Sequence, residues 1–114
     1  MQLITVNIWG GKVYNPLFKF INKYKNNTDI FCFQEVFRSD RDVITHHSHS
    51  NVIKDLVKAL PEFNHYYSPT AEGHDTRGPV DFPLDFGQAT FIKRGVNVKN
   101  QGEIFVHRSF NKPG

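Results

Sequence analysis

The sequence predicts an α/β fold, because two strand patterns flank an amphipathic helix. Residues 3–9 alternate between apolar and polar side chains, which is the period of a strand. Residues 30–34, IFCFQ, are almost entirely apolar and typical of a strand buried on both faces. Between them, apolar side chains recur at helical spacing from Leu17 to Tyr24. Strand, helix and strand joined by short links form a βαβ unit with parallel strands.

The first strand is expected to end at the glycine pair 10–11. We then expect Asn15 to cap the first helix, with Pro16 at its first helical position. This helix should end near residues 26–27. A second helix is predicted over residues 51–60, where apolar side chains again fall on one face, with Ser50 or Asn51 as its cap and Pro61 as its stop.

The rest of the chain is predicted to be strands separated by turns. The expected strands cover residues 63–68, 86–93, 95–98 and 103–106. A tight turn at 94–95 joins the second and third of these. A long loop is expected at residues 69–85, which are rich in Gly, Pro, Asp and Thr, and loops of that length are usually functional or disordered.

Composition bounds the class of protein. The 114 residues suffice for one domain, and a net charge of +3 tolerates a polyanionic partner without requiring one. The single cysteine, Cys32, lies in the apolar run, which excludes an internal disulfide and suits a reducing compartment. The first residues have neither a basic segment nor a long apolar stretch. We therefore expect a cytoplasmic protein with no membrane span.

Two polar side chains are candidates for a site. Glu35 directly follows the apolar strand, where it either marks the exit into solvent or binds a metal ion. Asn7 lies near the carboxyl end of the first strand. Neighbouring parallel strands would bring both residues to one rim of the sheet, where ligands bind in such folds. A Mg²⁺ ion takes oxygen ligands of this kind, together with water and substrate phosphate.

Three segments resemble motifs of the endonuclease/exonuclease/phosphatase superfamily of DNase I-like enzymes. They are VNIWGG at 6–11, DIFCFQEVF at 29–37 and FGQATFIKR at 86–94. The resemblance implies half of a four-layer α/β/β/α sandwich, with a mixed sheet and helices on one face. It also implies a phosphoester hydrolase that uses Mg²⁺ or Mn²⁺, with Glu35 as the metal ligand and Asn7 as a catalytic and substrate-orienting residue. The substrate would be a nucleic acid, a phospholipid or a sugar phosphate.

The chain departs from the family pattern in two respects. Trp9 stands where the abasic-site endonucleases carry an aspartate, and the sequence lacks the later Gly-Asp-Phe-Asn and Ser-Asp-His motifs. We therefore expect residues 1–114 to be the N-terminal part of one domain, inactive alone. The alternative is a non-catalytic half-domain used for interaction or assembly. We also expect self-association or a complementing C-terminal half, packed on a sheet face that includes Phe31, Phe33 and Phe91.

Other polar residues have competing interpretations. Arg38 is placed to bind a substrate phosphate, or else to pair with Asp40 or Asp42. The histidines at 46, 47 and 49 suggest zinc, but a solvated polar loop is favoured because no cysteine is nearby. Of the neighbouring tyrosines at 66 and 67, one ring is expected in the core and the other exposed. The segment 74–77, with His74, Asp75 and Arg77, is expected to be surface.

Overall fold

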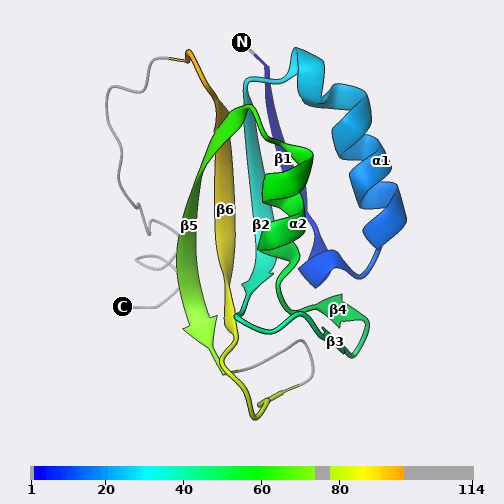
Figure 1. The fold of residues 1–114 in the computed structure, drawn as a ribbon, viewed down its shortest axis with the longest axis vertical. Helices are drawn as coiled ribbons and strands as arrows, with labels where there is room; N and C mark the ends of the chain where they lie inside the picture. The colour runs from blue at the N-terminus through cyan, green and yellow to red at the C-terminus, as the bar shows by residue number, and fades with distance from the viewer. Residues whose placement is uncertain (1, 74–77, 97–114) are drawn as a thin grey trace, which may run out of the picture.

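A four-stranded mixed sheet carries both α-helices of the described residues on one face (Figure 1). This computed structural model describes residues 2–73 and 78–96. The sheet order is β1-β2-β6-β5, and a second, two-stranded sheet pairs β3 with β4. The strands are β1 Leu3–Asn7, β2 Ile30–Arg38, β3 Ile44–Thr45, β4 Ser48–His49, β5 Phe63–Glu72 and β6 Asp85–Lys93. The helices are α1 Tyr14–Tyr24 and α2 Val52–Ala59, with 3₁₀ turns η1 Trp9–Gly11 and η2 Lys25–Asn27.

The predicted βαβ unit is confirmed. Strands β1 and β2 run parallel, with Asn7 opposite Gln34, and α1 connects them. Strand β6 pairs antiparallel with both β2 and β5, so the sheet is mixed as expected.

Three strand lengths were predicted wrongly: β1 ends at Asn7 and not at Trp9, β2 continues past Gln34 to Arg38, and β5 continues to Glu72, into the predicted loop. Strands β2 and β5 extend further than predicted because their last residues, Arg38 and Glu72, both pair with Asp85 of β6. The sequence pattern of a single strand does not reveal such pairing.

The start of α1 differs from the predicted cap, whereas the predicted cap position of α2 is confirmed. Helix α1 begins at Tyr14 with Val13 at the N-cap, so Asn15 and Pro16 lie inside its first turn. Proline is tolerated there because the first N–H groups of a helix have no intrahelical partner. Helix α2 does have Asn51 at its N-cap, but that side chain makes no cap hydrogen bond.

The core lies between the sheet and the helices. Its largest fully buried side chains include Phe31, Phe33 and Phe91, against Ile21 of α1 and Leu56 of α2. The expectation that these three phenylalanines form the free face of the sheet is therefore wrong. Strand side chains alternate between faces, so an assignment displaced by one residue moves the whole apolar set to the opposite side.

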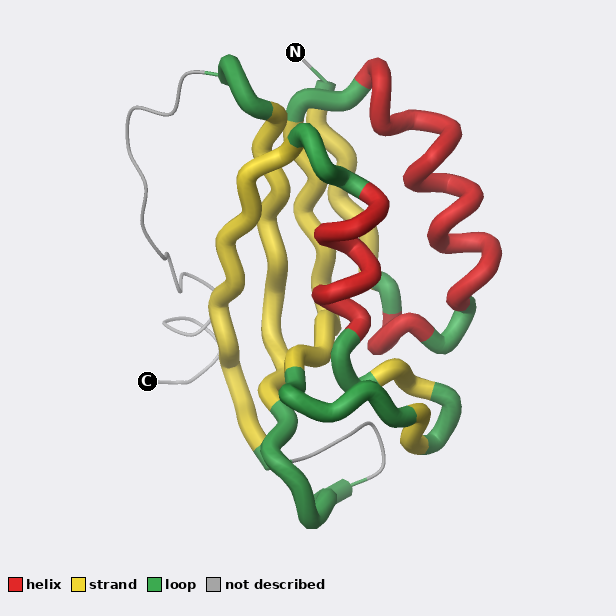
Figure 2. Tube along the Cα trace, viewed as in Figure 1, coloured by secondary structure: helices red, strands yellow, loops and turns green. Residues whose placement is uncertain are grey.

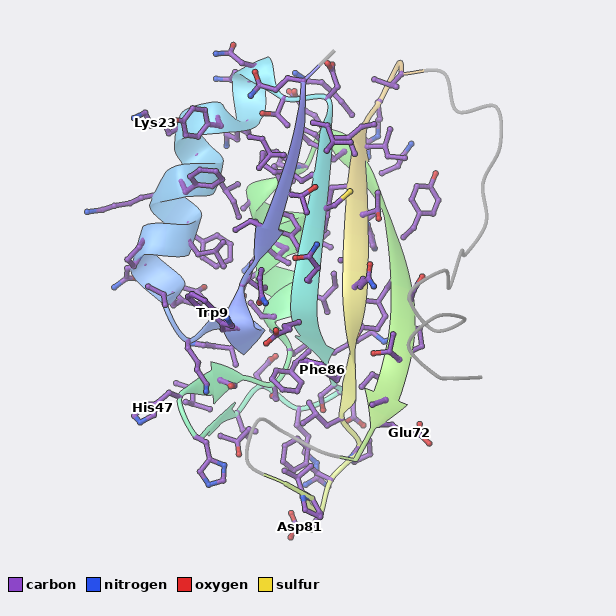
Figure 3. All side chains as sticks on the ribbon, turned by 180° about the vertical axis from the view of Figure 1, so that it is seen from behind. Trp9, Lys23, His47, Glu72, Asp81 and Phe86 are labelled. Carbon is purple, nitrogen blue, oxygen red and sulfur yellow. The ribbon has the colours of Figure 1, made fainter. Side chains whose placement is uncertain are left out.

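The other face of the sheet carries no helix in the described part of the chain (Figure 3). One row across the four strands consists of Thr5, Cys32, Thr90 and Tyr66, as the pairing register shows. Thr5 is exposed and the other three are half-buried, so Cys32 is not enclosed on both sides as its sequence context suggested. The adjacent row on this face is mostly apolar and consists of Leu3, Ile30, Ile92 and Asn64. The open face therefore combines apolar and polar side chains. Association through it stays a prediction.

Several expected features lie outside the described residues. These are His74, Asp75, Arg77, the strand at 103–106 and residues 97–98 of the strand predicted at 95–98, whose first two residues are not in a strand. The turn at 94–95 is present directly after β6. Within the described part of the chain, neither helix is long and apolar enough to cross a membrane.

Gly87 of β6 should tolerate no side chain, because the backbone of the paired strand β5 lies very close to it. A Cβ added there would lie 2.1 Å from the backbone oxygen of Ser68. Relieving such overlap requires a backbone shift, so Gly87→Ala should lower the free energy of unfolding by about 1–3 kcal/mol or more in urea titrations. The control is Gln88→Ala at the exposed neighbouring position, which should change it little. Equal stability of the two variants would contradict the close packing of β5 on β6.

Candidate functional site at the carboxyl end of strand β1

Asn7 and Glu35 meet at the carboxyl end of β1, as predicted. The Asn7 side-chain Nδ2 donates a hydrogen bond of 2.6 Å to Glu35 Oε2. Both side chains are half-buried, so the pair lies at the surface of the protein without being fully exposed. The predicted adjacency is therefore confirmed, while the roles of the two residues in catalysis stay predictions.

A β-bulge directs Glu35 to this position. Phe33 lies opposite Ala89, but Val36 lies opposite Gly87, so β2 contains one residue more than β6 over this stretch. Glu35 has a φ of 59°, in the left-handed region that non-glycine residues seldom occupy. In a regular strand, residue 35 would share the core-facing side with Phe33. The bulge instead gives the core position to Val36, which is fully buried, and turns the carboxylate out of the core.

The Asn7 amide is held in one orientation. Its Oδ1 accepts a 3.0 Å hydrogen bond from the backbone N–H of Trp9, which leaves Nδ2 to face Glu35. Trp9 itself has a φ of 49°. The preceding residue, Ile8, donates a backbone hydrogen bond of 3.1 Å to the Gln34 oxygen, which connects this turn to β2. Glu35 of the pair and the neighbouring Trp9 thus both have strained backbones, and such strain tends to concentrate at functional sites.

A side chain of β5, Tyr67, stabilises the bulge in β2. The hydroxyl of Tyr67 donates a 2.7 Å hydrogen bond to the Val36 oxygen, next to Glu35. Burial raises the pKa of the Tyr67 hydroxyl well above its usual value, so it remains a donor at neutral pH. The sequence predicted one of Tyr66 and Tyr67 in the core and the other exposed, but both are half-buried. The contact of Tyr67 was not predicted, because its partner is a backbone oxygen on a strand distant in the sequence.

Arg38 lies over the Tyr67 ring, with the guanidinium carbon 4.3 Å from the ring centroid. Its Nε and Nη2 both contact Asp85 Oδ2, at 3.1 and 2.8 Å. The partner is therefore Asp85 of β6, not Asp40 or Asp42 as one interpretation of the sequence had it. The register of β2 on β6 places Arg38 opposite Asp85, which no local pattern could indicate.

The histidine-rich stretch forms a hairpin rather than an irregular loop. Residues His46 and His47 make its turn with positive φ, and His49 stacks on Tyr14 with ring centroids 4.4 Å apart. Burial and the Asp55 carboxylate, which accepts a 3.0 Å hydrogen bond from Tyr14, raise the pKa of the Tyr14 hydroxyl. Among residues 2–73 and 78–96, no group of three or more His, Cys, Asp or Glu side chains is arranged to hold a metal ion.

A cleft of about 300 Å³ lies between this hairpin and α2. Asp42 at its edge contacts Lys54 at 2.6 Å, and hydrogen bonds from Lys54 and Asn51 lower the pKa of Asp42. Asp42 and Lys54 pair with each other, and Asp55, which also lines the cleft, accepts the hydrogen bond from the Tyr14 hydroxyl. The cleft contains neither Asn7 nor Glu35, so it is separate from the candidate site.

Comparison with known proteins identifies the fold. No family model matches the sequence, and no curated protein matches it. A solved structure of an endonuclease/exonuclease/phosphatase family protein from Leptotrichia buccalis C-1013-b superposes with a TM-score of 0.51 and 16% sequence identity. The chain has the fold of part of that protein. The match covers 86% of this chain and 39% of the other, so the chain spans well under half of its structural neighbour.

This likeness agrees with the sequence resemblance, and it supports the DNase I-like half-fold with a mixed sheet and helices on one face. At 16% identity it establishes the fold alone. Activity, substrate and metal dependence therefore have to be argued from the residues of the site.

Tyr67→Phe should weaken the support of the bulge. It removes a donor to a part-buried carbonyl, so the free energy of unfolding should fall by about 1 kcal/mol in urea titrations at pH 7. Because the folded-state pKa of Tyr67 is raised, this contribution is present below pH 10 and is lost as the pH rises further. Tyr66→Phe, on the opposite face of β5, is the matched control and should have a smaller effect. A larger loss for Tyr66→Phe would refute the role of the Tyr67 hydroxyl.

Two buried serines of the hairpin should respond differently to alanine. Ser50 Oγ accepts a 2.9 Å hydrogen bond from Val43 N–H and donates to the Arg41 oxygen. Ser48 Oγ is buried without a hydrogen-bond partner among the described residues. Ser50→Ala should therefore lower the free energy of unfolding by about 1–3 kcal/mol, whereas Ser48→Ala should be neutral or stabilising. Thermal denaturation of both variants measures the difference, and the reverse order would disprove this assignment.

Proposed function

We propose that the complete protein carrying this chain is a divalent-metal-dependent phosphoester hydrolase. The observation that supports this most directly is the Asn7–Glu35 pair at the carboxyl end of β1, in a fold shared with an endonuclease/exonuclease/phosphatase family protein. Ligands in such folds bind beyond the carboxyl ends of the strands. The shared fold supports this location for the site, and the two side chains support its proposed chemistry.

The donor set fits Mg²⁺ or Mn²⁺. Glu35 offers carboxylate oxygens at a half-buried position, and the Asn7 amide is adjacent. Magnesium is commonly held by one or two carboxylates, with water and substrate phosphate completing its coordination. We propose Glu35 as the protein ligand of this ion. The chemistry supplied by the bound cation is polarisation of a phosphoryl oxygen and neutralisation of charge on the leaving oxygen.

The residues around Glu35 have positioning roles in this proposal. Asn7 orients the substrate or the nucleophile through its amide, whose direction the Trp9 backbone N–H fixes. Arg38 binds a substrate phosphate oxygen through guanidinium donors other than the two that contact Asp85. Stacking on Tyr67 and pairing with Asp85 hold the guanidinium in place, which reduces the entropy lost when phosphate binds.

The described residues supply one carboxylate to the site and no arrangement of further metal ligands. The general base and the other ligands would therefore come from residues outside those described. We propose that residues 1–114 alone are catalytically silent, because a single carboxylate holds Mg²⁺ weakly and no base activates water. Its substrate would be a nucleic acid, a phospholipid or a sugar phosphate.

Glu35→Gln in the complete protein should abolish most of the activity. The substitution keeps the shape and hydrogen bonding of the side chain but removes the charge that anchors the cation. Losing an essential metal ligand should lower kcat/KM about a thousandfold on a panel of nucleic-acid, lipid and sugar phosphoesters assayed with Mg²⁺ or Mn²⁺. Chelation with EDTA should have a comparable effect on the unmodified protein.

The matched control is Glu62→Gln, an exposed carboxylate directly before β5, at the far end of the sheet from Glu35. It should leave activity unchanged. Activity that survives both EDTA and Glu35→Gln would defeat the metal assignment. Absence of any hydrolysis by the complete protein would instead favour the alternative, a half-domain used for interaction.

A further inference from the structure

The net positive charge of the chain comes from its first quarter. Residues 1–28 contain four lysines and no aspartate or glutamate, whereas the other 86 residues contain ten basic and eleven acidic side chains. The net charge of +3 therefore originates entirely in this first segment, and two of its lysines, Lys19 and Lys23, lie in α1. A surface with one sign of charge attracts partners of the opposite sign.

One side of α1 carries these two lysines together with asparagines. Residues three or four apart lie on the same side of a helix, and that spacing relates the exposed polar residues of α1 and of the following turn η2. We call this set the lysine face; it consists of Asn15, Lys19, Asn22, Lys23 and Asn26. Figure 2 shows α1 as the outermost helix, alongside the sheet, and Figure 3 shows Lys23 on the side of α1 turned away from the strands.

The charge of the lysine face is not neutralised by neighbouring carboxylates. Neither Lys19 nor Lys23 forms an ion pair within residues 2–73 and 78–96; Lys23 instead lies 5.3 Å from the Tyr24 ring centroid. Lys93 adds a further ammonium group at the end of the face, where its Nζ donates a 3.3 Å hydrogen bond to the Asn26 oxygen. The face is therefore a continuous cationic surface.

Helix stability does not account for the composition of the lysine face. Lys19 and Lys23 are four residues apart, and like charges at this spacing destabilise a helix. Lys23 benefits from its place in the last turn, near the negative end of the helix dipole, but Lys19 does not. Asn22 lies inside α1, where asparagine is a poor helix former. Binding of an anionic partner would offset the repulsion and use the polar side chains.

The chemistry of the lysine face fits a nucleic-acid backbone better than a membrane. One helical turn separates Lys19 from Lys23, a rise of about 6 Å, which is close to the rise of ~6.8 Å over two nucleotides of one B-DNA strand. Asparagine amides beside the lysines add donors for phosphate and sugar oxygens. A helix that enters a membrane interface needs a free apolar side, whereas the apolar side of α1, including Leu17 and Ile21, packs in or against the core.

We propose that the lysine face of α1 binds the sugar–phosphate backbone of a nucleic acid without reading its base sequence. Backbone contacts of this kind position a protein on nucleic acid and carry no sequence information. Helix α1 begins near the carboxyl end of β1 and runs back toward its amino end, so the face extends away from the Asn7–Glu35 site (Figure 1). Binding there requires neither a metal ion nor hydrolysis, and it is therefore independent of the proposed function.

The test is fluorescence anisotropy of a labelled DNA duplex of about 20 base pairs, titrated with the complete protein in EDTA at about 50 and 200 mM KCl. The variant is Lys19→Gln with Lys23→Gln, which removes both charges and retains good helix formers. It should bind the duplex about tenfold more weakly at the lower salt concentration. The slope of log K against log salt should fall by about two, one for each lost phosphate contact.

Lys54→Gln with Lys58→Gln is the matched control on α2. It removes the same charge at the same spacing from two exposed lysines, but Asp42 lies beside this pair. The pKa of Asp42 is lowered chiefly by its hydrogen bond from Lys54 and also by the charge of Lys58. The control variant should bind the duplex like the unmodified protein. Urea titration should show the lysine-face variant at least as stable as the unmodified protein, because a like-charge repulsion is removed.

Two outcomes would overturn the proposal: no binding of the duplex by the unmodified protein at the lower salt concentration, or equal weakening by the two double variants. Weaker binding of the lysine-face variant to phosphatidylserine vesicles, with duplex binding unchanged, would assign the face to an anionic membrane instead. Duplex binding through the lysine face by a complete protein that hydrolyses no phosphoester would support this inference while refuting the proposed function.

Discussion

The extra residue in β2 is the constraint on which the candidate site depends. Without the bulge, strand alternation would direct residue 35 toward the same core as Phe33, where an ionised carboxylate is costly. With it, Glu35 turns to the Asn7 amide and Val36 fills the core position. One local irregularity therefore satisfies two opposing requirements, a continuous apolar core and an accessible carboxylate at its edge.

The surroundings of the bulge are built to hold it. Tyr67 from β5 donates a hydrogen bond to the Val36 oxygen. The backbone of β5 also lies so close to Gly87 that a Cβ at this position would overlap the Ser68 oxygen. On the other side, the Trp9 and Ile8 backbone N–H groups tie the η1 turn to Asn7 and to β2. The strained backbone of Glu35 and Trp9 is thus compensated by contacts from neighbouring segments, which is the condition under which such strain persists.

The two faces of the sheet serve different purposes. The face covered by α1 and α2 contains the phenylalanine-rich core, so this half of the fold buries its main apolar set without a second sheet. The open face combines a row that contains Thr5 and Cys32 with a mostly apolar row that contains Leu3, Ile30 and Ile92. Any layer that packs there would contact both kinds of side chain.

The sequence by itself determined the βαβ unit, both helices and the neighbourhood of Asn7 and Glu35, because hydrophobic period is a local property and a strand–helix–strand connection with short links makes its two strands parallel. Tertiary structure decided the rest. The bulge at Glu35, the face occupied by Phe31 and the pairing of Arg38 with Asp85 all depend on the register between β2 and β6. These strands are far apart in the sequence, and a register displaced by one residue preserves every local pattern while inverting which side chains are buried. The position of the exposed Trp9 beside Asn7 likewise follows from how the η1 turn packs on the hairpin.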